Sequence, residues 1–245
     1  MRRLAARRWG AVISRPSVTV SFLTYRNPAW MNLCLEGLAY ARNSTPAVIR
    51  VVGCDAEDSV VTTGRLDQDF RSPDPSEHYL SRVYRAWNAA VESAPTELVC
   101  LLNDDMVVSD YWLDELVDAK LADSKTVPCS LLVESGRIPS AMPEYCRDFG
   151  LTPDTLDVEG WRLHAATVRK AGETEPGRLF MPCLLERETF SRLGSYPLGN
   201  PPGTTGDKDL FARLTQAGYR HVTALGSVCY HVQSGAMLEG EAAGR

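Results

Sequence analysis

The stretch Leu101-Leu102-Asn103-Asp104-Asp105-Met106-Val107-Val108 decides the fold, because an apolar run leads directly into two adjacent carboxylates and then turns apolar again. Two aspartates at the end of a buried strand repel each other and are costly to desolvate, so a positive charge is expected opposite them. A divalent cation that also holds a diphosphate meets this need. The alternative is a solvated turn, since Asp and Asn are common at strand ends for local hydrogen bonding.

The composition is that of an ordinary globular protein with one sizeable core. The chain has 245 residues, of which 44% are hydrophobic and 23% charged, and its net charge of −5 gives no general attraction to nucleic acid. The seven cysteines are scattered and include no C-x-x-C pair. They are typical of small buried hydrophobes in a reducing compartment, and not of a disulfide framework or a zinc site.

Residues 1–16 form an extension whose basic start is followed by only about six weakly apolar residues. This is too short for a signal-peptide core, and no stretch of the chain approaches the ~20 apolar residues of a transmembrane segment. We expect a solvated extension, the alternative being a basic amphipathic segment on an anionic surface. The predicted location is cytoplasmic, or peripheral at a membrane surface.

Residues 17–118 alternate between strand and helix patterns. Strands are predicted at 17–23, 47–52 and 97–102, and helices at 30–38 and 80–91, with a helix capped by Ser109 or Asp110 after them. This order predicts a parallel sheet with right-handed crossovers. Because ligands bind beyond the carboxyl ends of such strands, Tyr25, Asp55 and Asp104 are expected to converge.

Residues 119–245 are predicted to form the second half of the same domain. Frequent Pro and Gly over 120–178 indicate short strands and loops there, with a helix near 163–170. A helix over 207–218 and a strand pair over 222–232 complete the pattern. Trp161 lies in the irregular region, and it either stacks on an acceptor sugar or is buried.

Four segments, in order, resemble the GT-A-fold glycosyltransferases of family 2. They are Val18–Pro28, Val51–Ser59, Leu101–Asp105 with Trp112-Leu113, and a tail made of Gly206–Leu214, Ala217–Arg220 and Cys229–Ser234. The resemblance spans residues 18–234. It implies an α/β, GT-A-like fold with a single mostly parallel central sheet, a Rossmann-like N-terminal half that binds the nucleotide sugar, and a smaller irregular lobe on the acceptor side.

The sequence departs from the family pattern at two positions. Asn103 replaces the first aspartate of the DxD-like triplet, so metal binding rests mainly on Asp105. Gly206 stands where the family has a glutamate before the last long helix. The resemblance implies Asp105 and His231 as ligands of Mn²⁺ or Mg²⁺, with Mn²⁺ favoured by the imidazole, and Asp104 directed toward the ribose. The alternative for His231 is a strand histidine bonded to backbone.

The remaining candidates serve the nucleotide and the acceptor. Asp55 is expected to bind the base by accepting a hydrogen bond from N3–H of uracil, with Thr24 and Tyr25 beside it. Arg85 and Asn88 lie one helical turn apart and are candidates to reach the base or a phosphate.

Asp207 is the predicted general base, placed near a helix N-terminus whose dipole stabilises its anion. The alternatives are a turn aspartate for Asp55, a solvated Arg85 and a helix cap for Asp207. Asp209 is expected to cap the helix or to pair with Arg213.

These residues predict a metal-dependent inverting glycosyltransferase that moves a sugar from a UDP-sugar to an acceptor hydroxyl. The acceptor would be a saccharide, a lipid-linked carrier, a natural product or a protein. One alternative is a non-catalytic GT-A scaffold that binds a nucleotide sugar. Another is a transferase for modified nucleic acid, guided by the arginines at 2, 3, 7 and 8, which the acidic net charge disfavours.

Overall fold

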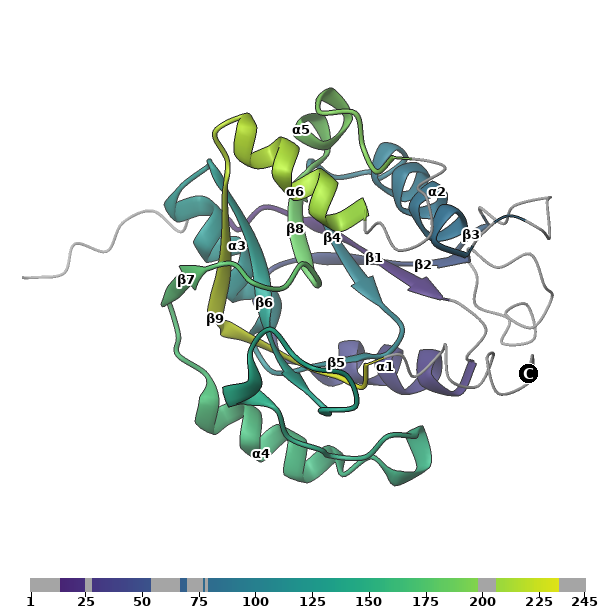
Figure 1. Ribbon diagram of the computed structural model, residues 1–245, viewed down its shortest axis with the longest axis vertical. Coiled ribbons are helices and arrows are strands. Elements are labelled where there is room, and N and C mark those ends of the chain that lie inside the picture. Colours follow the sequence, from purple (N-terminus) through teal and green to yellow (C-terminus); the bar gives the residue numbers. More distant parts are fainter. Residues whose placement is uncertain are drawn as a thin grey trace, which may run out of the picture.

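A computed structural model describes residues 14–24, 28–53, 67–69, 77, 79–197 and 206–233. The described residues form one nine-stranded sheet with the order β3-β2-β1-β4-β8-β6-β9-β5, and β7 pairs with β9 (Figure 1). The strands are β1 (Val18–Thr24), β2 (Ala47–Gly53), β3 (Gln68–Asp69), β4 (Leu98–Asn103), β5 (Met106–Val108), β6 (Thr126–Glu134), β7 (Thr174–Pro176), β8 (Cys183–Glu186) and β9 (Arg220–His231). The α-helices are α1 (Pro28–Tyr40), α2 (Tyr79–Glu92), α3 (Trp112–Ala122), α4 (Val158–Val168), α5 (Arg187–Arg192) and α6 (Gly206–Gln216).

The first half of the chain forms the parallel part of the sheet, as its alternating pattern predicts. β1 lies between β2 and β4 and is parallel to both, and β3 continues the parallel order beyond β2. All seven residues of β1 are buried, which is the property expected of a strand covered on both faces. Leu23 pairs with Asn103 in the register of β1 and β4, so the carboxyl ends of these two strands lie side by side.

The second half adds strands to this same sheet. β8 runs antiparallel to both β4 and β6, and β9 is parallel to β6 over most of its length. The predicted strand pair over 222–232 is one twelve-residue strand, which also pairs with β7 near its start and with β5 at its end. The sheet joins both halves of the chain, and the ends of β4, β6 and β9 bring their polar residues together.

The strand β6 corrects the expectation of short strands and loops over 120–178. All nine of its residues are buried, but Pro128 and Ser130 interrupt the apolar pattern. β8 pairs with β6 only at Cys129, so the missing N–H of Pro128 is tolerated there. The hydroxyl of Ser130 lies 2.7 Å from that of Ser227, which satisfies both polar groups inside the core.

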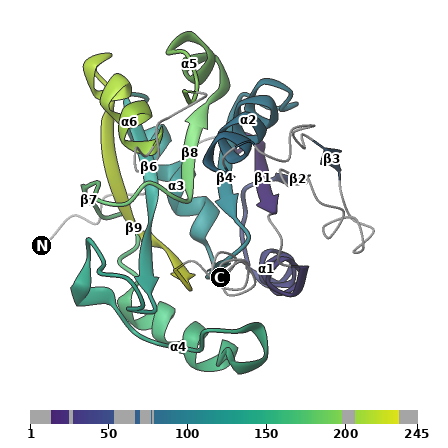
Figure 2. The same ribbon diagram turned by 45° about the vertical axis from the view of Figure 1, so that its right-hand side comes forward.

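The helices cover the sheet on opposite sides. Figures 1 and 2 show α2, α5 and α6 together on one side, and α1 and α4 on the other. Trp161 of α4 is fully buried and packs against Phe149 and Tyr230, so it is a core residue and cannot stack on an acceptor sugar. The expected cap of α3 is also different, because Tyr111 occupies the cap position and Asp110 instead binds Arg42.

The described helices include none that is both long and apolar enough to cross a bilayer. Six of the cysteines lie in the described part of the chain, and all six are free thiols. Five of them are buried, in agreement with their prediction as small hydrophobic residues.

Candidate functional site

A cleft of about 560 Å³ lies at the carboxyl ends of β1, β4 and β6. Its lining brings four carboxylates together with one histidine, and both α2 and α6 contribute to its walls. Its polar and charged lining residues are Asn103, Asp104, Asp105, Glu134, Arg178, Asp207, Lys208, His231 and Gln233. Volume and composition match those of small-molecule sites in proteins, which combine apolar walls with a few convergent polar groups.

The two aspartates of the deciding stretch occupy the tight turn between β4 and β5. Asp104 is 5% exposed and Asp105 is 7% exposed. The carbonyl oxygen of Asp104 accepts a hydrogen bond from the Cys34 thiol, and that of Asp105 accepts one from the Val232 N–H at 3.2 Å. Contacts from α1 and from the residue after β9 therefore fix the turn, and its carboxylates line the cleft.

Strand register places His231 beside the aspartate pair. At the end of β9, His231 is aligned with Glu134 of the parallel strand β6 and with Met106 of the antiparallel strand β5. Its Nε2 lies 3.4 Å from Oδ2 of Asp105, and its Nδ1 lies 3.2 Å from Oε1 of Glu134. The imidazole is thus held between two carboxylates, one on each ring nitrogen.

The electrostatics of this group follow from its geometry. Burial alone lowers the pKa of His231, but the charge of Asp105 and the hydrogen bonds that the imidazole donates to Asp105 and Glu134 outweigh this effect and raise the pKa to about 10. Burial likewise opposes ionisation of Glu134, yet its hydrogen bond with His231 leaves its pKa lowered. In the absence of another cation, a protonated His231 supplies the positive charge that the carboxylates require.

The donor set fits a divalent cation. No group of three or more His, Cys, Asp and Glu side chains in the described ranges is arranged as a complete metal cage. Asp105 and His231 offer an oxygen and an imidazole nitrogen at the cleft, and the Glu134 bond to Nδ1 is the partner that metal-binding histidines usually have. The remaining ligands would come from a diphosphate or water. Metal binding at Nε2 would release the proton of His231.

Asp207 lies in the first turn of α6 and faces the same cleft. The hydroxyl of Tyr196 donates a hydrogen bond of 3.0 Å to its Oδ1. Burial raises the pKa of Asp207, and the Tyr196 hydrogen bond only partly opposes this. The helix dipole was expected to stabilise the anion, but desolvation by the surrounding residues is the larger effect on this carboxyl group. A carboxylate with a raised pKa is a better proton acceptor near neutral pH.

Close contact with the Tyr84 ring explains why position 206 is a glycine. Its N–H donates to the hydroxyl of Tyr84 at 2.7 Å, and a Cβ at this position would lie 2.7 Å from Cζ of the Tyr84 ring. The Tyr84 ring stacks on Tyr196 with centroids 5.0 Å apart. Any side chain at position 206, including the glutamate of the family pattern, would displace this stacked pair.

Asn88 and Arg85 do not line the cleft. The amide of Asn88 is used by the backbone of Tyr196: Nδ2 donates to its carbonyl at 2.9 Å, and Oδ1 accepts its N–H at 2.8 Å. Arg85 forms an exposed ion pair with Glu77. Neither side chain is therefore directed at a base or a phosphate in this structure, and Asn88 instead holds Tyr196 in place.

The other predicted residues divide into two groups. Thr24 is buried at the end of β1, where its register partner is Gly53 of β2. Tyr25 and Asp55 lie outside the described residues, as do the arginines at 2, 3, 7 and 8. Asp209 pairs with Arg213 at 2.8 Å, as expected.

Sequence reasoning missed Glu134 and Tyr196. Glu134 ends the run Leu131-Leu132-Val133, so it follows the same pattern of an apolar strand leading into a carboxylate that marks Asp104. The polar residues earlier in β6 hid that signal. Tyr196 follows a glycine-containing turn after α5 and has no local motif, because its role depends on contacts with α2 and α6.

Comparisons with known proteins support the fold at low sequence identity. No protein-family model matches this sequence, and no curated protein matches it. Among solved structures, the chain is similar to the crystal structure of GalNAc-T7 with UDP, GalNAc and Mn²⁺, with a TM-score of 0.59 and 13% identity. The match covers 88% of this chain but 43% of that one, so the chain spans less than half the length of its structural neighbour. The predicted GT-A-like α/β fold is confirmed.

Proposed function

We propose that this protein is a metal-dependent glycosyltransferase that uses a nucleotide-diphosphate sugar, with a UDP-sugar as donor and a hydroxyl as acceptor. The observation that carries the proposal is the convergence of Asp105, His231 and Asp207 in one cleft at the carboxyl ends of the strands. In α/β sheets this is where ligands bind. The ordered motifs of the sequence favour an inverting enzyme similar to family 2.

The charge of the cleft supports a metal-bound diphosphate. Four carboxylates line it, and of the two basic side chains Arg178 is already paired with Glu144 and Glu175. A diphosphate would be repelled unless a cation accompanied it. Asp105 and His231 would hold Mn²⁺, or Mg²⁺, and when bound the cation would neutralise the charge that develops on the leaving diphosphate. The structural neighbour was crystallised with UDP and Mn²⁺, which agrees with this assignment.

The proposed donor contacts extend beyond the metal ligands. Asp104 is directed toward the ribose, and Thr24, Tyr25 and Asp55 remain the proposed contacts of the base. Thr24 supports this placement because β1 ends beside β2, the strand that leads to Asp55. Arg85 and Asn88 are not part of the proposed site.

Asp207 is the proposed general base. It accepts the proton of the acceptor hydroxyl while the new carbon–oxygen bond forms and the bond from the anomeric carbon to the diphosphate oxygen breaks. The Tyr196 hydroxyl occupies Oδ1 and holds the carboxyl group in place. Because burial raises its pKa, Asp207 takes up the proton readily, and attack on the face opposite the diphosphate inverts the anomeric centre.

The experiment is a screen of UDP-sugars and GDP-sugars against acceptor libraries with Mn²⁺, followed by release of the nucleoside diphosphate and by NMR of the anomeric product. Asp207→Asn should lower the rate by about 10²- to 10⁴-fold. Asp209→Asn is the matched control, because Asp209 lies on the same helix but is half-exposed and pairs with Arg213. Equal loss in both variants would contradict the assignment of the base, and nucleotide binding without any turnover would favour the scaffold alternative.

A further inference from the structure

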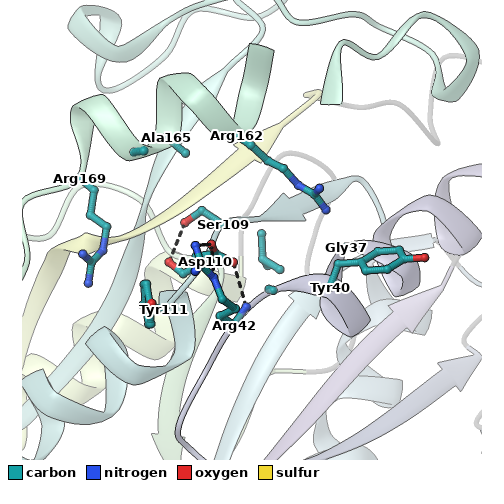
Figure 3. A pocket seen from close by; sticks show the side chains of 12 residues that line it. Gly37, Tyr40, Arg42, Ser109, Asp110, Tyr111, Arg162, Ala165 and Arg169 are labelled. Atoms are coloured by element: carbon teal, nitrogen blue, oxygen red, sulfur yellow. Dashed lines mark hydrogen bonds and ion pairs between the residues drawn. The ribbon is translucent and has the colours of Figure 1, made fainter. Parts of the chain in front are cut away.

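A second pocket, of about 370 Å³, lies between the end of α1, the segment from β5 to α3, and one face of α4. It shares no lining residue with the cleft described above. Three arginines from separate parts of the chain line it: Arg42 after α1, Arg162 on α4 and Arg169 just beyond α4 (Figure 3). Guanidinium groups gathered in a concavity are the usual means of binding oxyanions.

Three arginines share two carboxylates here, Asp110 and Glu115, so the pocket keeps one positive charge in excess. Arg42 binds Asp110 through Nε at 2.8 Å, and Arg169 binds Glu115, so two of the three guanidinium groups are neutralised. In the described part of the chain, Arg162 has no ion pair, and its guanidinium carbon lies 5.8 Å from the centroid of the Tyr40 ring. The pocket therefore matches a ligand that carries a single negative charge.

The aromatic walls indicate a ring beside that charge. Tyr40 is 70% exposed, and Figure 3 shows Arg162 reaching from α4 toward it. On the opposite side, Tyr111 lies under two guanidinium groups, with Arg42 at 5.6 Å and Arg169 at 5.1 Å from its ring centroid. Exposed tyrosine rings present flat surfaces on which the C–H face of a sugar or another ring can pack.

The backbone of Tyr111 is strained in this arrangement. Its φ of 64° and ψ of 10° lie in the left-handed region, which non-glycine residues seldom adopt. The N–H of Tyr111 donates to the carbonyl of Arg42 at 2.6 Å, and its own carbonyl accepts the N–H of Glu115. Strained backbone of this kind concentrates at ligand sites, because the surrounding structure must hold it. Here it places Tyr111 in the lining of the pocket, beside the guanidinium groups of Arg42 and Arg169.

We propose that this pocket binds a small monoanionic ligand in which one carboxylate is attached to a sugar-like ring. Arg162 receives the carboxylate through its unpaired planar fork, and Tyr40 and Tyr111 pack against the ring. The site is independent of the nucleotide cleft, so its occupant is separate from the donor. A carboxylate is favoured over a phosphate monoester because a second negative charge would face Asp110 without a further free cation.

The test is a titration of ¹⁵N-labelled protein with a hexuronate, followed through the Nε–Hε signals of the arginines. Neutral hexose, a hexose 6-phosphate and sodium chloride at matched ionic strength are the comparison titrants. We expect saturable shifts at the arginines of this pocket with the hexuronate, and the same affinity when UDP and Mn²⁺ are present. Arg162→Gln should weaken binding by about tenfold or more.

Arg220→Gln is the matched control, since Arg220 is an exposed arginine paired with Asp123 at the start of β9. Tyr111→Asn is a second variant, because asparagine tolerates the left-handed backbone and removes the ring, and it should also weaken binding. The proposal is overturned if no saturable shift occurs, if the sugar phosphate binds more tightly, if UDP displaces the hexuronate, or if Arg162→Gln and Arg220→Gln have equal effects.

Discussion

Replacing Asn88 with alanine tests whether this residue serves the nucleotide or the architecture of the site. Its amide forms two hydrogen bonds with the backbone of Tyr196, which is 2% exposed. Each such bond contributes about 1 kcal/mol net, and a buried backbone group left unpaired costs about 1–3 kcal/mol. Asn88→Ala should therefore lower the free energy of unfolding by about 2–3 kcal/mol.

The same change should impair catalysis through Tyr196. The Tyr196 hydroxyl donates to Asp207, so a shift of its backbone misplaces the proposed base. Urea unfolding followed by tryptophan fluorescence measures the loss of stability, which we expect as a fall of about 1 M in the midpoint with an unchanged slope. Calorimetric titration of UDP should show affinity within a few-fold of the wild type, while the transfer rate falls.

Arg85→Ala is the control, because Arg85 lies one turn away on α2 and forms an ion pair with Glu77 at the surface. Its effect on stability should stay within about 1 kcal/mol. If Asn88→Ala unfolds at the wild-type urea concentration but binds UDP much more weakly, the reasoning is refuted. Asn88 would then contact the nucleotide, as the sequence alone indicated.

Three further predictions concern the cleft. Because burial raises the pKa of Asp207, the protonated form of this group favours folding, and that contribution is lost as pH rises through the folded-state pKa. At neutral pH, Asp207→Asn should therefore raise the free energy of unfolding by about 0.5–2 kcal/mol and increase the melting temperature. A lower melting temperature would contradict the burial argument. Glu134→Gln removes the charged partner of His231 Nδ1 and should weaken Mn²⁺-dependent UDP binding by about 10- to 100-fold in calorimetry, and unchanged affinity would remove Glu134 from the site. Gly206→Ala places a Cβ against the Tyr84 ring, so it should lower the free energy of unfolding by about 1–3 kcal/mol in urea and also slow sugar transfer. Gly218→Ala is the control: its strain comes from a backbone φ of 83°, so it should lower stability but leave the rate of sugar transfer unchanged.

The parallel half of the sheet was predictable because its strands are rich in apolar and β-branched residues and none of them contains a proline. β1, β2 and β4 begin and end within a residue or two of the expected positions, and β1 and β4 are buried almost throughout, whereas the first four residues of β2 are exposed or half-buried. β6 was not predictable on the same grounds. Pro128 and Ser130 break its pattern, and only the tertiary contacts of β8 and β9 make them acceptable in a buried strand.

In the candidate site, too, residues in local patterns were predictable and residues that depend on tertiary contacts were not. Asp104, Asp105 and Asp207 could be identified because a strand end and a helix N-terminus are local features with recognisable patterns. The pairing of His231 with Glu134 depends on the register between β6 and β9, which are separated by almost 100 residues. Asn88 shows the converse, because its partner Tyr196 lies 108 residues away and no local pattern reveals it.

The central claim is that Asp105 and His231 hold the cation that binds a UDP-sugar. Calorimetric titration of UDP and GDP, with Mn²⁺, Mg²⁺ or EDTA, tests it most directly when wild type is compared with Asp105→Ala. The account predicts UDP binding that requires the metal, is lost in EDTA and is abolished by the substitution. Binding that survives both EDTA and Asp105→Ala, or the absence of any nucleotide binding with every metal, would contradict it.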